Sequence, residues 1–273
     1  VRKKLKLYCW RGGDHPEVVL EPARQKLEQG YKAVKMNATG AFEWIDSIKK
    51  VKKVSDNIRI LREEFGDELD IGLDFHGRIH KGMVKRLIDE LQPYHPMFIE
   101  EPVLSENNEA LDHIYKYTGI PIATGERMYS RWDFKEVLHR GVVDIIQPDL
   151  SHAGGISEVR RIAAMAEAYD VALAPHCPLG PISLASALQL DFACTNAILQ
   201  ESSLGIHYNK GFDLLDYMAN PEVFAVEDGY ISLNTKSGLG IEINEERLRE
   251  GQKIGHDWSN PIWRNEDGSI AEW

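Results

Sequence analysis

Short apolar runs alternate along the chain with longer segments of helical spacing. The short runs are rich in aliphatic residues, which predicts β-strands. They lie at Leu5–Trp10, Ala33–Asn37, Ile71–His76, Met97–Glu101, Pro121–Glu126, Asp144–Asp149, Val171–His176 and Ile198–Ser202. Between them apolar residues recur every three or four positions, for example at Val51, Val54, Ile58 and Leu61, as on the buried face of a helix.

The repeated order of strand and helix predicts parallel βαβ units. Eight such strands favour a closed α/β barrel of the TIM type over an open doubly wound sheet. No GxGxxG or GKS/GKT motif follows the first strand, which argues against a nucleotide-binding fold. We expect the barrel to span residues 1–204. The alternation then changes, so residues 205–273 are expected to form a C-terminal extension.

Composition and charge narrow the class of protein. The chain has 273 residues, of which 43% are hydrophobic, enough for one large core. Its formal net charge of −11 argues against a nucleic-acid partner. The sequence contains no run of about 18 apolar residues, so it predicts no membrane span. The three cysteines are too few for a disulfide framework, which is typical of a reduced, cytoplasmic protein.

Acidic residues end three consecutive predicted strands, where barrel enzymes carry their chemistry. Asp74, Glu100 and Glu126 are spaced 26 and 26 residues apart. One such carboxylate is more often a helix cap, but three side by side repel one another unless a cation neutralises them. Oxygen ligands favour Mg²⁺ before Mn²⁺. Glu100 and Glu101 are adjacent in a strand, so only one of them can face inward, and the spacing leaves that choice open.

Two histidines also end predicted strands. His76 follows Asp74 by two residues, which in a strand puts both side chains on one side. His176 and Asp149 end neighbouring strands, so they can form a hydrogen bond. A carboxylate on one imidazole nitrogen fixes the tautomer and raises the basicity of the other, as in a general base. The alternative is that Asp149 caps the helix that starts near Gly154.

Several runs occur in a fixed order along the chain. They are Asp74–Arg78, Phe98–Pro102, Thr124–Arg127, Gln147–Asp149, Ala174–His176 and Gln200–Glu201. In these runs the sequence resembles the enolase superfamily, mandelate-racemase-like subgroup. The resemblance implies a (β/α)7β barrel plus an α+β capping domain, to which the C-terminal tail belongs. We expect the N-terminal segment of that cap to be missing from this sequence. The chain also begins without Met, so we expect it to lack an N-terminal portion.

The resemblance also implies a role for each candidate residue. It makes Asp74, Glu100 and Glu126 the ligands of one Mg²⁺ per subunit. His176 becomes the general base and His76 the general acid. Asp149 raises the basicity of His176, and Glu201 stabilises the intermediate through the substrate carboxylate. A divalent ion on that carboxylate stabilises the enediolate formed when the neighbouring proton leaves.

The second predicted strand separates two reactions of the subgroup. Its racemases place Lys-x-Lys there, with the second Lys as a base facing the His base. This chain has Lys35-Met36-Asn37, so racemisation by two opposed bases is disfavoured and dehydration is favoured. Lys35 and Asn37 are then candidates for substrate binding. Alternatively, Lys35 is an ordinary interior cation paired with a carboxylate.

Within the superfamily, the runs Gln147–Gly155 and Ala174–Pro181 resemble those of a dehydratase of sugar acids. The leading reaction converts D-galactonate to 2-dehydro-3-deoxy-D-galactonate and water. The implied partner is a small-molecule sugar acid, and the implied assembly is a homo-oligomer. One alternative is a dehydratase of a different sugar acid, and another is a non-catalytic barrel that binds sugar acids. The first strand, Leu7–Arg11, has no His-x-His, which sets the metal-dependent hydrolases aside.

Overall fold

Eight parallel strands form a barrel in the computed structural model, which describes residues 2–10, 19–205, 212–255 and 262–271. The strands are β1 (Lys4–Trp10), β2 (Ala33–Asn37), β3 (Asp70–Asp74), β4 (Phe98–Glu100), β5 (Ile122–Thr124), β6 (Ile145–Ile146), β7 (Ala172–Leu173) and β8 (Leu199–Ser202). They pair in the order β7-β6-β5-β4-β3-β2-β1-β8. A parallel bridge between Leu173 and Ala197 joins β7 to the residues before β8, so the ring closes.

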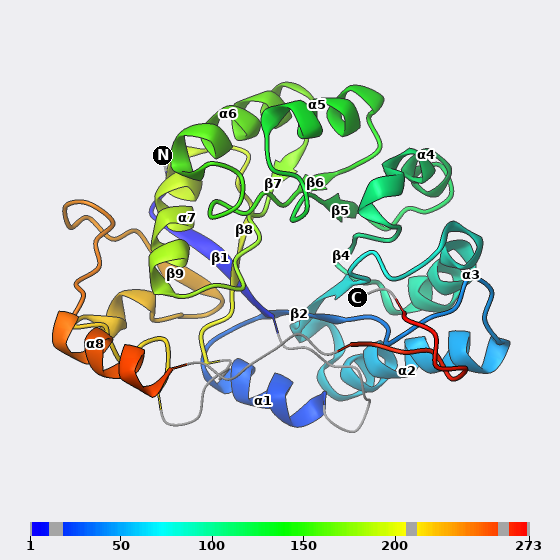
Figure 1. Cartoon of the computed structure of the whole chain (residues 1–273), viewed down its shortest axis with the longest axis horizontal. Coiled ribbons are helices and arrows are strands. Elements are labelled where there is room, and N and C mark those ends of the chain that lie inside the picture. Colours follow the sequence, from blue (N-terminus) through cyan, green and yellow to red (C-terminus); the bar gives the residue numbers. More distant parts are fainter. Residues whose placement is uncertain (1, 11–18, 206–211, 256–261, 272–273) are drawn as a thin grey trace.

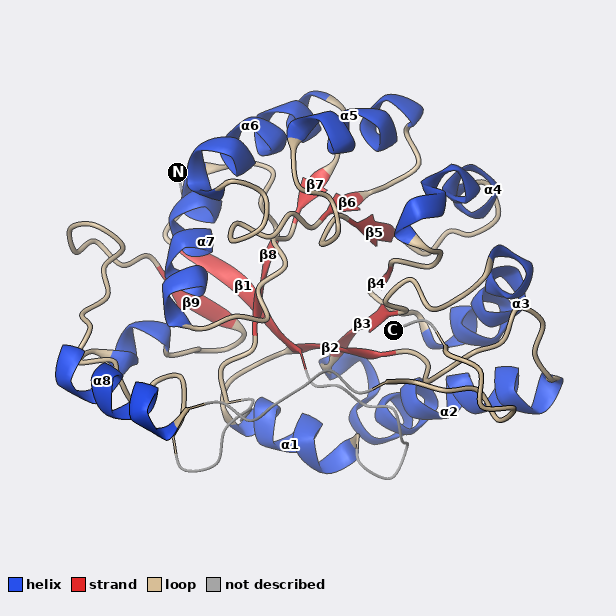
Figure 2. Ribbon diagram, viewed as in Figure 1, coloured by secondary structure: helices blue, strands red, loops and turns tan. Residues whose placement is uncertain are grey.

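Helices connect the successive strands and form the outer layer (Figures 1 and 2). They are α1 (Leu20–Glu28), α2 (Ile48–Phe65), α3 (Lys81–Leu91), α4 (Leu111–Tyr115), α5 (Arg131–Arg140), α6 (Gly155–Ala168) and α7 (Pro181–Ala193). Short 3₁₀ turns lie at η2 (Gly66–Glu68), η3 (Gln92–Tyr94), η4 (Ser105–Ala110) and η5 (Pro221–Phe224). The expected (β/α)7β barrel is thus confirmed. In the described part of the chain, no helix combines the length and the apolar character needed to cross a membrane.

The barrel interior is apolar at one end and charged at the other. Tyr8 and Phe98 fill the apolar end, with ring centroids 5.9 Å apart. A Cβ on Gly72 would lie 2.7 Å from the Phe98 ring, so glycine makes room for this large side chain. Buried polar side chains occupy the other end, where the strands meet the loops that precede the helices. That end is where barrel sites form.

Several strands are shorter than the apolar runs predict. β3 ends at Asp74 rather than His76, and β4 ends at Glu100. The backbone then turns to a left-handed conformation, with φ of 49° at His76 and 41° at Glu101. A strand cannot continue through such residues. His76 still lies beside Asp74 as expected, with Nε2 3.1 Å from Asp74 Oδ2, but the turn after β3 places it there and not the period of a strand.

The C-terminal extension lies against the first strand of the barrel. β9 (Tyr230–Ser232) pairs antiparallel with β1, and Ile231 faces Leu5 in that pairing. Both side chains belong to one buried apolar cluster. α8 (Glu245–Ile254) follows on the outside and has no buried residue. The part of the extension around β9 is thus packed on the barrel itself.

Candidate active site

Lys35 lies among three carboxylates at the charged end of the barrel. Its Nζ is 2.8 Å from Glu100 Oε1, 3.0 Å from Glu201 Oε1 and 3.5 Å from Asp74 Oδ2. All four side chains are at most 1% exposed. Burial alone would lower the pKa of Lys35, but these carboxylates raise it well above its usual value. The geometry matches the alternative of an interior cation paired with carboxylates, and substrate binding by Lys35 stays a prediction.

Asp74, His76 and Glu126 form a group that suits a metal ion. Among the described residues, one possible ligand atom from each lies within 4.8 Å of the others. His76 Nε2 is 3.1 Å from Asp74 Oδ2. No hydrogen bond within the described residues reaches Asp74 Oδ2 or Glu126 Oε2, although both atoms are buried. Buried carboxylate oxygens that accept no hydrogen bond are the kind of ligand that a hard divalent cation such as Mg²⁺ prefers.

Glu100 lies beside this group rather than in it. Its Oε1 contacts Lys35, and its Oε2 accepts a hydrogen bond of 2.6 Å from Gln147 Nε2. Glu101 is also buried, but it faces Arg127, whose Nε is 3.2 Å from Glu101 Oε2. Burial raises the pKa of both glutamates well above their usual range. The two adjacent carboxylates therefore contact different partners, Glu100 with Lys35 and Gln147, and Glu101 with Arg127.

Asp149 and His176 form the expected pair. Asp149 Oδ2 is 2.9 Å from His176 Nδ1, and Asp149 Oδ1 accepts a hydrogen bond of 2.6 Å from the Ser151 amide. Asp149 therefore caps a local turn with one oxygen and contacts the imidazole with the other. Helix α6 has Gly154 at its N-cap, so Asp149 is not its cap. His176 Nε2 points at Glu126 Oε2, 3.2 Å away.

The two imidazoles have opposite pKa shifts. Burial alone would lower the pKa of His176, but Glu126, Asp149 and Glu201 raise it to about 9. For His76, burial lowers the pKa, although Asp74 and Glu126 act in the other direction. Without a metal ion, His176 therefore carries a proton at neutral pH. A base at His176 requires its anionic neighbours to be neutralised first.

Stability of the metal-free chain should depend on the protonation of His176. The pKa of His176 is raised to about 9 in the folded chain, against about 6.5 when unfolded. The stabilisation is therefore complete below about pH 6.5 and is lost as the pH rises through about 9. The shift corresponds to about 3 kcal/mol.

Urea unfolding at pH 6 and pH 9.5 measures this difference. His176→Asn should lose most of the pH-dependent part. If the variant and the parent chain lose equal stability over this range, another group titrates.

Glu201 and Asn37 complete the candidate residues. Glu201 Oε2 accepts a hydrogen bond of 2.8 Å from the Cys177 amide, while its Oε1 contacts Lys35. Asn37 is 5% exposed at the end of β2 and lies in register with Asp74 on β3. All nine predicted residues thus gather at one end of the barrel.

Sequence reasoning assigned no role to three residues that contact this cluster. They are Glu101, Arg127 and Gln147, each next to or within two positions of a predicted site residue. Arg127 donates a hydrogen bond of 2.6 Å to the His76 carbonyl, from 51 positions away in the chain. The signal that could have found them is their place within the runs that carry the family resemblance.

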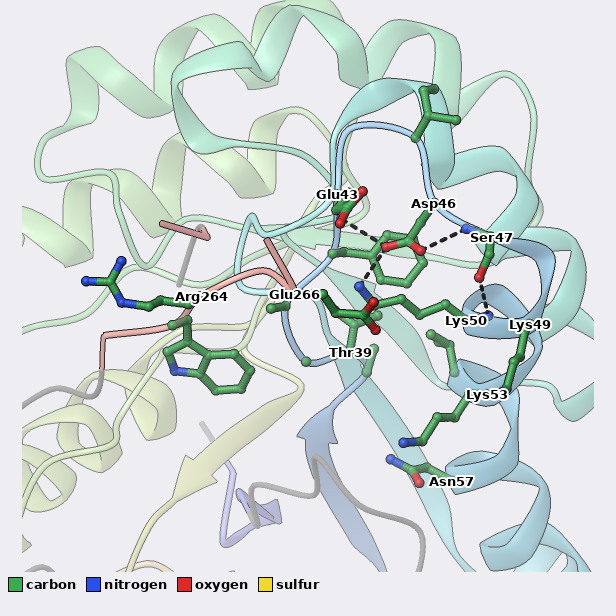
Figure 3. Close-up of a pocket in the computed structure, with 17 residues that line it drawn as sticks. Thr39, Glu43, Asp46, Ser47, Lys49, Lys50, Lys53, Asn57, Arg264 and Glu266 are labelled. Atoms are coloured by element: carbon green, nitrogen blue, oxygen red, sulfur yellow. Dashed lines mark hydrogen bonds and ion pairs between the residues drawn. The ribbon is translucent and has the colours of Figure 1, made fainter. Parts of the chain in front are cut away.

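A separate cavity of about 940 Å³ lies beside the end of β2 (Figure 3). It is lined by the loop after β2, by the first turns of α2 and by the C-terminal tail. None of the nine predicted site residues lines it. Its lysines and its acidic side chains are mixed, and Asp46 forms an ion pair of 2.7 Å with Lys50 (Figure 3). This mixture of charge singles out no class of ligand.

The chain belongs to the enolase superfamily, because the profile of the enolase C-terminal domain-like family matches residues 18–247. That range includes all nine predicted site residues. Among curated proteins, D-galactonate dehydratase of Pectobacterium atrosepticum is 55% identical over 273 residues. The match covers 100% of this chain and 72% of the relative.

Solved structures of the superfamily agree with the fold. An enolase of Agrobacterium radiobacter, proposed to be a galactarate dehydratase and bound to Na and L-malate, is 32% identical with a TM-score of 0.85. The match covers 99% of this chain and 71% of that one. A proposed dehydratase of Salmonella enterica serovar Typhimurium is 27% identical with a TM-score of 0.82, over 91% of this chain and 67% of that one. The prediction of an enzyme of the hydro-lyase class is confirmed by this kinship.

Proposed function

We propose that the chain is a Mg²⁺-dependent dehydratase that converts D-galactonate to 2-dehydro-3-deoxy-D-galactonate and water. The observation that carries the proposal is the placement of two imidazoles close to Glu126. His176 Nε2 lies 3.2 Å from Glu126 Oε2. Possible ligand atoms of His76, Glu126 and Asp74 lie within 4.8 Å of one another. The identity of 55% to a D-galactonate dehydratase supports this substrate.

His176 would take the proton from C2 of the sugar acid. Asp149 holds Nδ1 at 2.9 Å, which leaves Nε2 as the basic nitrogen. That nitrogen points into the carboxylate cluster, where the reacting carbon must lie for proton transfer. The contact with Asp149 favours the protonated imidazole, so it helps His176 to accept the C2 proton.

His76 would protonate the departing C3 hydroxyl. It follows β3, whereas His176 follows β7, so the two imidazoles reach the cluster from different sides. Hydroxide is a poor leaving group, and a general acid contributes about 10²–10⁴-fold to such a step. Burial lowers the pKa of His76, but the negative charge of an incoming carboxylate favours its protonated form.

Asp74 and Glu126, with Glu100 beside them, would hold the Mg²⁺. When bound, the ion supplies positive charge that stabilises the substrate carboxylate as negative charge develops there. Lys35, Asn37 and Glu201 line the β2 and β8 side of the cluster, and we assign the substrate carboxylate to that side. Glu201 is anchored at both oxygens, by Lys35 and by the Cys177 amide, so its position is set before substrate binds.

A dehydratase of a different sugar acid is the second candidate. The Agrobacterium relative is bound to L-malate, a 2-hydroxy acid like every aldonic and aldaric acid. In this assignment the residues named above would contact only the carboxylate and the first carbons, which these acids share. Length and stereochemistry must then be read by other residues.

A panel of sugar acids tests the proposal. The purified chain is incubated with D-galactonate, D-gluconate, D-mannonate and galactarate, with Mg²⁺ or with a chelator, and 2-keto-3-deoxy acids are measured. We expect product from D-galactonate with Mg²⁺ and none with the chelator. The Pectobacterium enzyme serves as the positive control. Binding of D-galactonate in a calorimeter without any product would favour the non-catalytic alternative and overturn the proposal.

A further inference from the structure

The imidazole of His76 depends on an unusual backbone conformation. His76 has φ of 49°, in the left-handed region that non-glycine residues seldom occupy. In this conformation its Nε2 lies 3.1 Å from Asp74 Oδ2. Such conformations persist only when surrounding contacts determine them, and they concentrate at functional sites.

Three hydrogen bonds donated by backbone amides hold the turn around His76. The His76 amide donates to Asp74 Oδ1 at 2.7 Å. The Gly77 amide donates to the Glu101 carbonyl at 3.0 Å, and the Arg78 amide donates to the Phe75 carbonyl at 2.9 Å. The turn is thus fastened both to itself and to the end of β4.

Arg127 holds the same turn from the loop after β5. Its Nη2 donates to the His76 carbonyl at 2.6 Å. Its Nη1 lies so close to Gly77 that a Cβ there would approach it to 3.3 Å. A guanidinium presents its donors in a rigid planar fork, so its orientation fixes the carbonyl that it contacts.

Glu101 orients Arg127 in turn. Glu101 Oε2 lies 3.2 Å from Arg127 Nε, and the Glu101 side chain is 1% exposed. Glu126 Oε1 lies 3.6 Å from the same nitrogen. The guanidinium therefore connects the left-handed residue after β3 with the left-handed residue after β4. We call the pair Glu101–Arg127 the brace.

We propose that Arg127 is a positioning residue for His76, and that Glu101 holds Arg127 in the required orientation. The inference rests on the proposed function, in which His76 is the general acid. It gives Glu101 a task distinct from that of its neighbour Glu100, whose oxygens contact Lys35 and Gln147. The brace acts on protonation of the leaving group and leaves proton removal at C2 to His176.

Arg127→Gln tests the brace by separating these two steps. We expect dehydration of D-galactonate to fall about tenfold or more, while exchange of the C2 proton with D₂O stays within about twofold of the parent chain. Arg127→Lys should stay impaired, because one ammonium group cannot contact both the His76 carbonyl and Glu101. Millimolar guanidinium should restore part of the activity of Arg127→Ala. Full activity of Arg127→Lys would overturn the brace.

Arg140→Gln is the matched control. Arg140 also joins a backbone carbonyl to a carboxylate, with Nη2 3.0 Å from the Glu109 carbonyl and an ion pair to Asp112. Its side chain is 16% exposed, and it lies on α5, away from the site. We expect Arg140→Gln to keep both dehydration and C2 exchange. Equal losses of dehydration in Arg127→Gln and Arg140→Gln would mean that Arg127 acts only through the stability of the fold.

Two further measurements test the brace without requiring the enzyme to turn over substrate. Amide hydrogen exchange at Gly77 and Arg78 should accelerate in Arg127→Gln and not in Arg140→Gln. Mg²⁺ affinity measured by calorimetry should stay within about twofold, and a parallel loss of affinity would show that Arg127 acts through Glu126 instead. If the parent chain dehydrates no sugar acid, the proposed function fails, but the amide exchange rates at Gly77 and Arg78 still test the brace. Unchanged amide exchange in Arg127→Gln would overturn the brace.

Discussion

His176→Asn should abolish the exchange of the C2 proton of D-galactonate with solvent deuterium. Loss of a general base costs about 10²–10⁴-fold, and Asn has no basic nitrogen to take the proton. The measurement is NMR in D₂O with Mg²⁺, following the C2 signal of the sugar acid over time. Asp149→Asn should slow the exchange less, because the imidazole remains but loses the partner 2.9 Å from Nδ1.

His152→Asn is the control for this variant. His152 Nδ1 lies 4.0 Å from the same carboxylate of Asp149, but its side chain is 47% exposed. Removing it takes one imidazole from beside Asp149 without touching His176, so exchange should continue at the parent rate. Normal exchange in His176→Asn would mean that another group is the base.

His76→Asn should stop dehydration while C2 exchange continues. The variant keeps His176 and Asp149, so proton removal is still possible, but no acid protonates the C3 hydroxyl. We expect the rate of product formation to fall about 10²–10⁴-fold. In D₂O the sugar acid should gain deuterium at C2 with little 2-keto-3-deoxy product.

A substrate with fluoride at C3 provides the control, because fluoride leaves without protonation. The His76→Asn variant should turn over the fluorinated acid at nearly the parent rate. Because possible ligand atoms of His76, Asp74 and Glu126 lie within 4.8 Å of one another, the Mg²⁺ affinity of the variant must be measured alongside. Unchanged dehydration would make His76 a structural neighbour of the metal, with the acid elsewhere.

The barrel was predictable because its strands and helices differ in apolar period. The start of β2 and its end at Asn37 match the apolar run, since every residue of this strand is buried. The ends of β3 and β4 did not match. The sequence pattern predicts that the strands continue to His76 and Glu101, but both residues are left-handed in the structure. A positive φ at His76 or Glu101 arises from contacts with other loops, which the local sequence does not carry.

The candidate site was predictable in part for a similar reason. Asp149 and His176 meet because they follow neighbouring parallel strands, which the order of the runs already implies. The choice between Glu100 and Glu101 depends on partners distant in sequence, Gln147 and Arg127. The contact of Arg127 with the His76 carbonyl likewise joins two separate loops. Such pairings appear only when the barrel closes.

A crystal structure of the chain with Mg²⁺ tests the central claim most directly, since both histidines are assigned to act around one metal ion. The account predicts one ion about 2.1 Å from a carboxylate oxygen of Asp74, of Glu126 and of Glu100. Glu100 must then turn from its contact with Gln147, which is 2.6 Å in the metal-free chain. Carboxylates that stay more than about 5 Å apart with no ion between them, well beyond Mg–O distances of about 2.1 Å, would contradict the account.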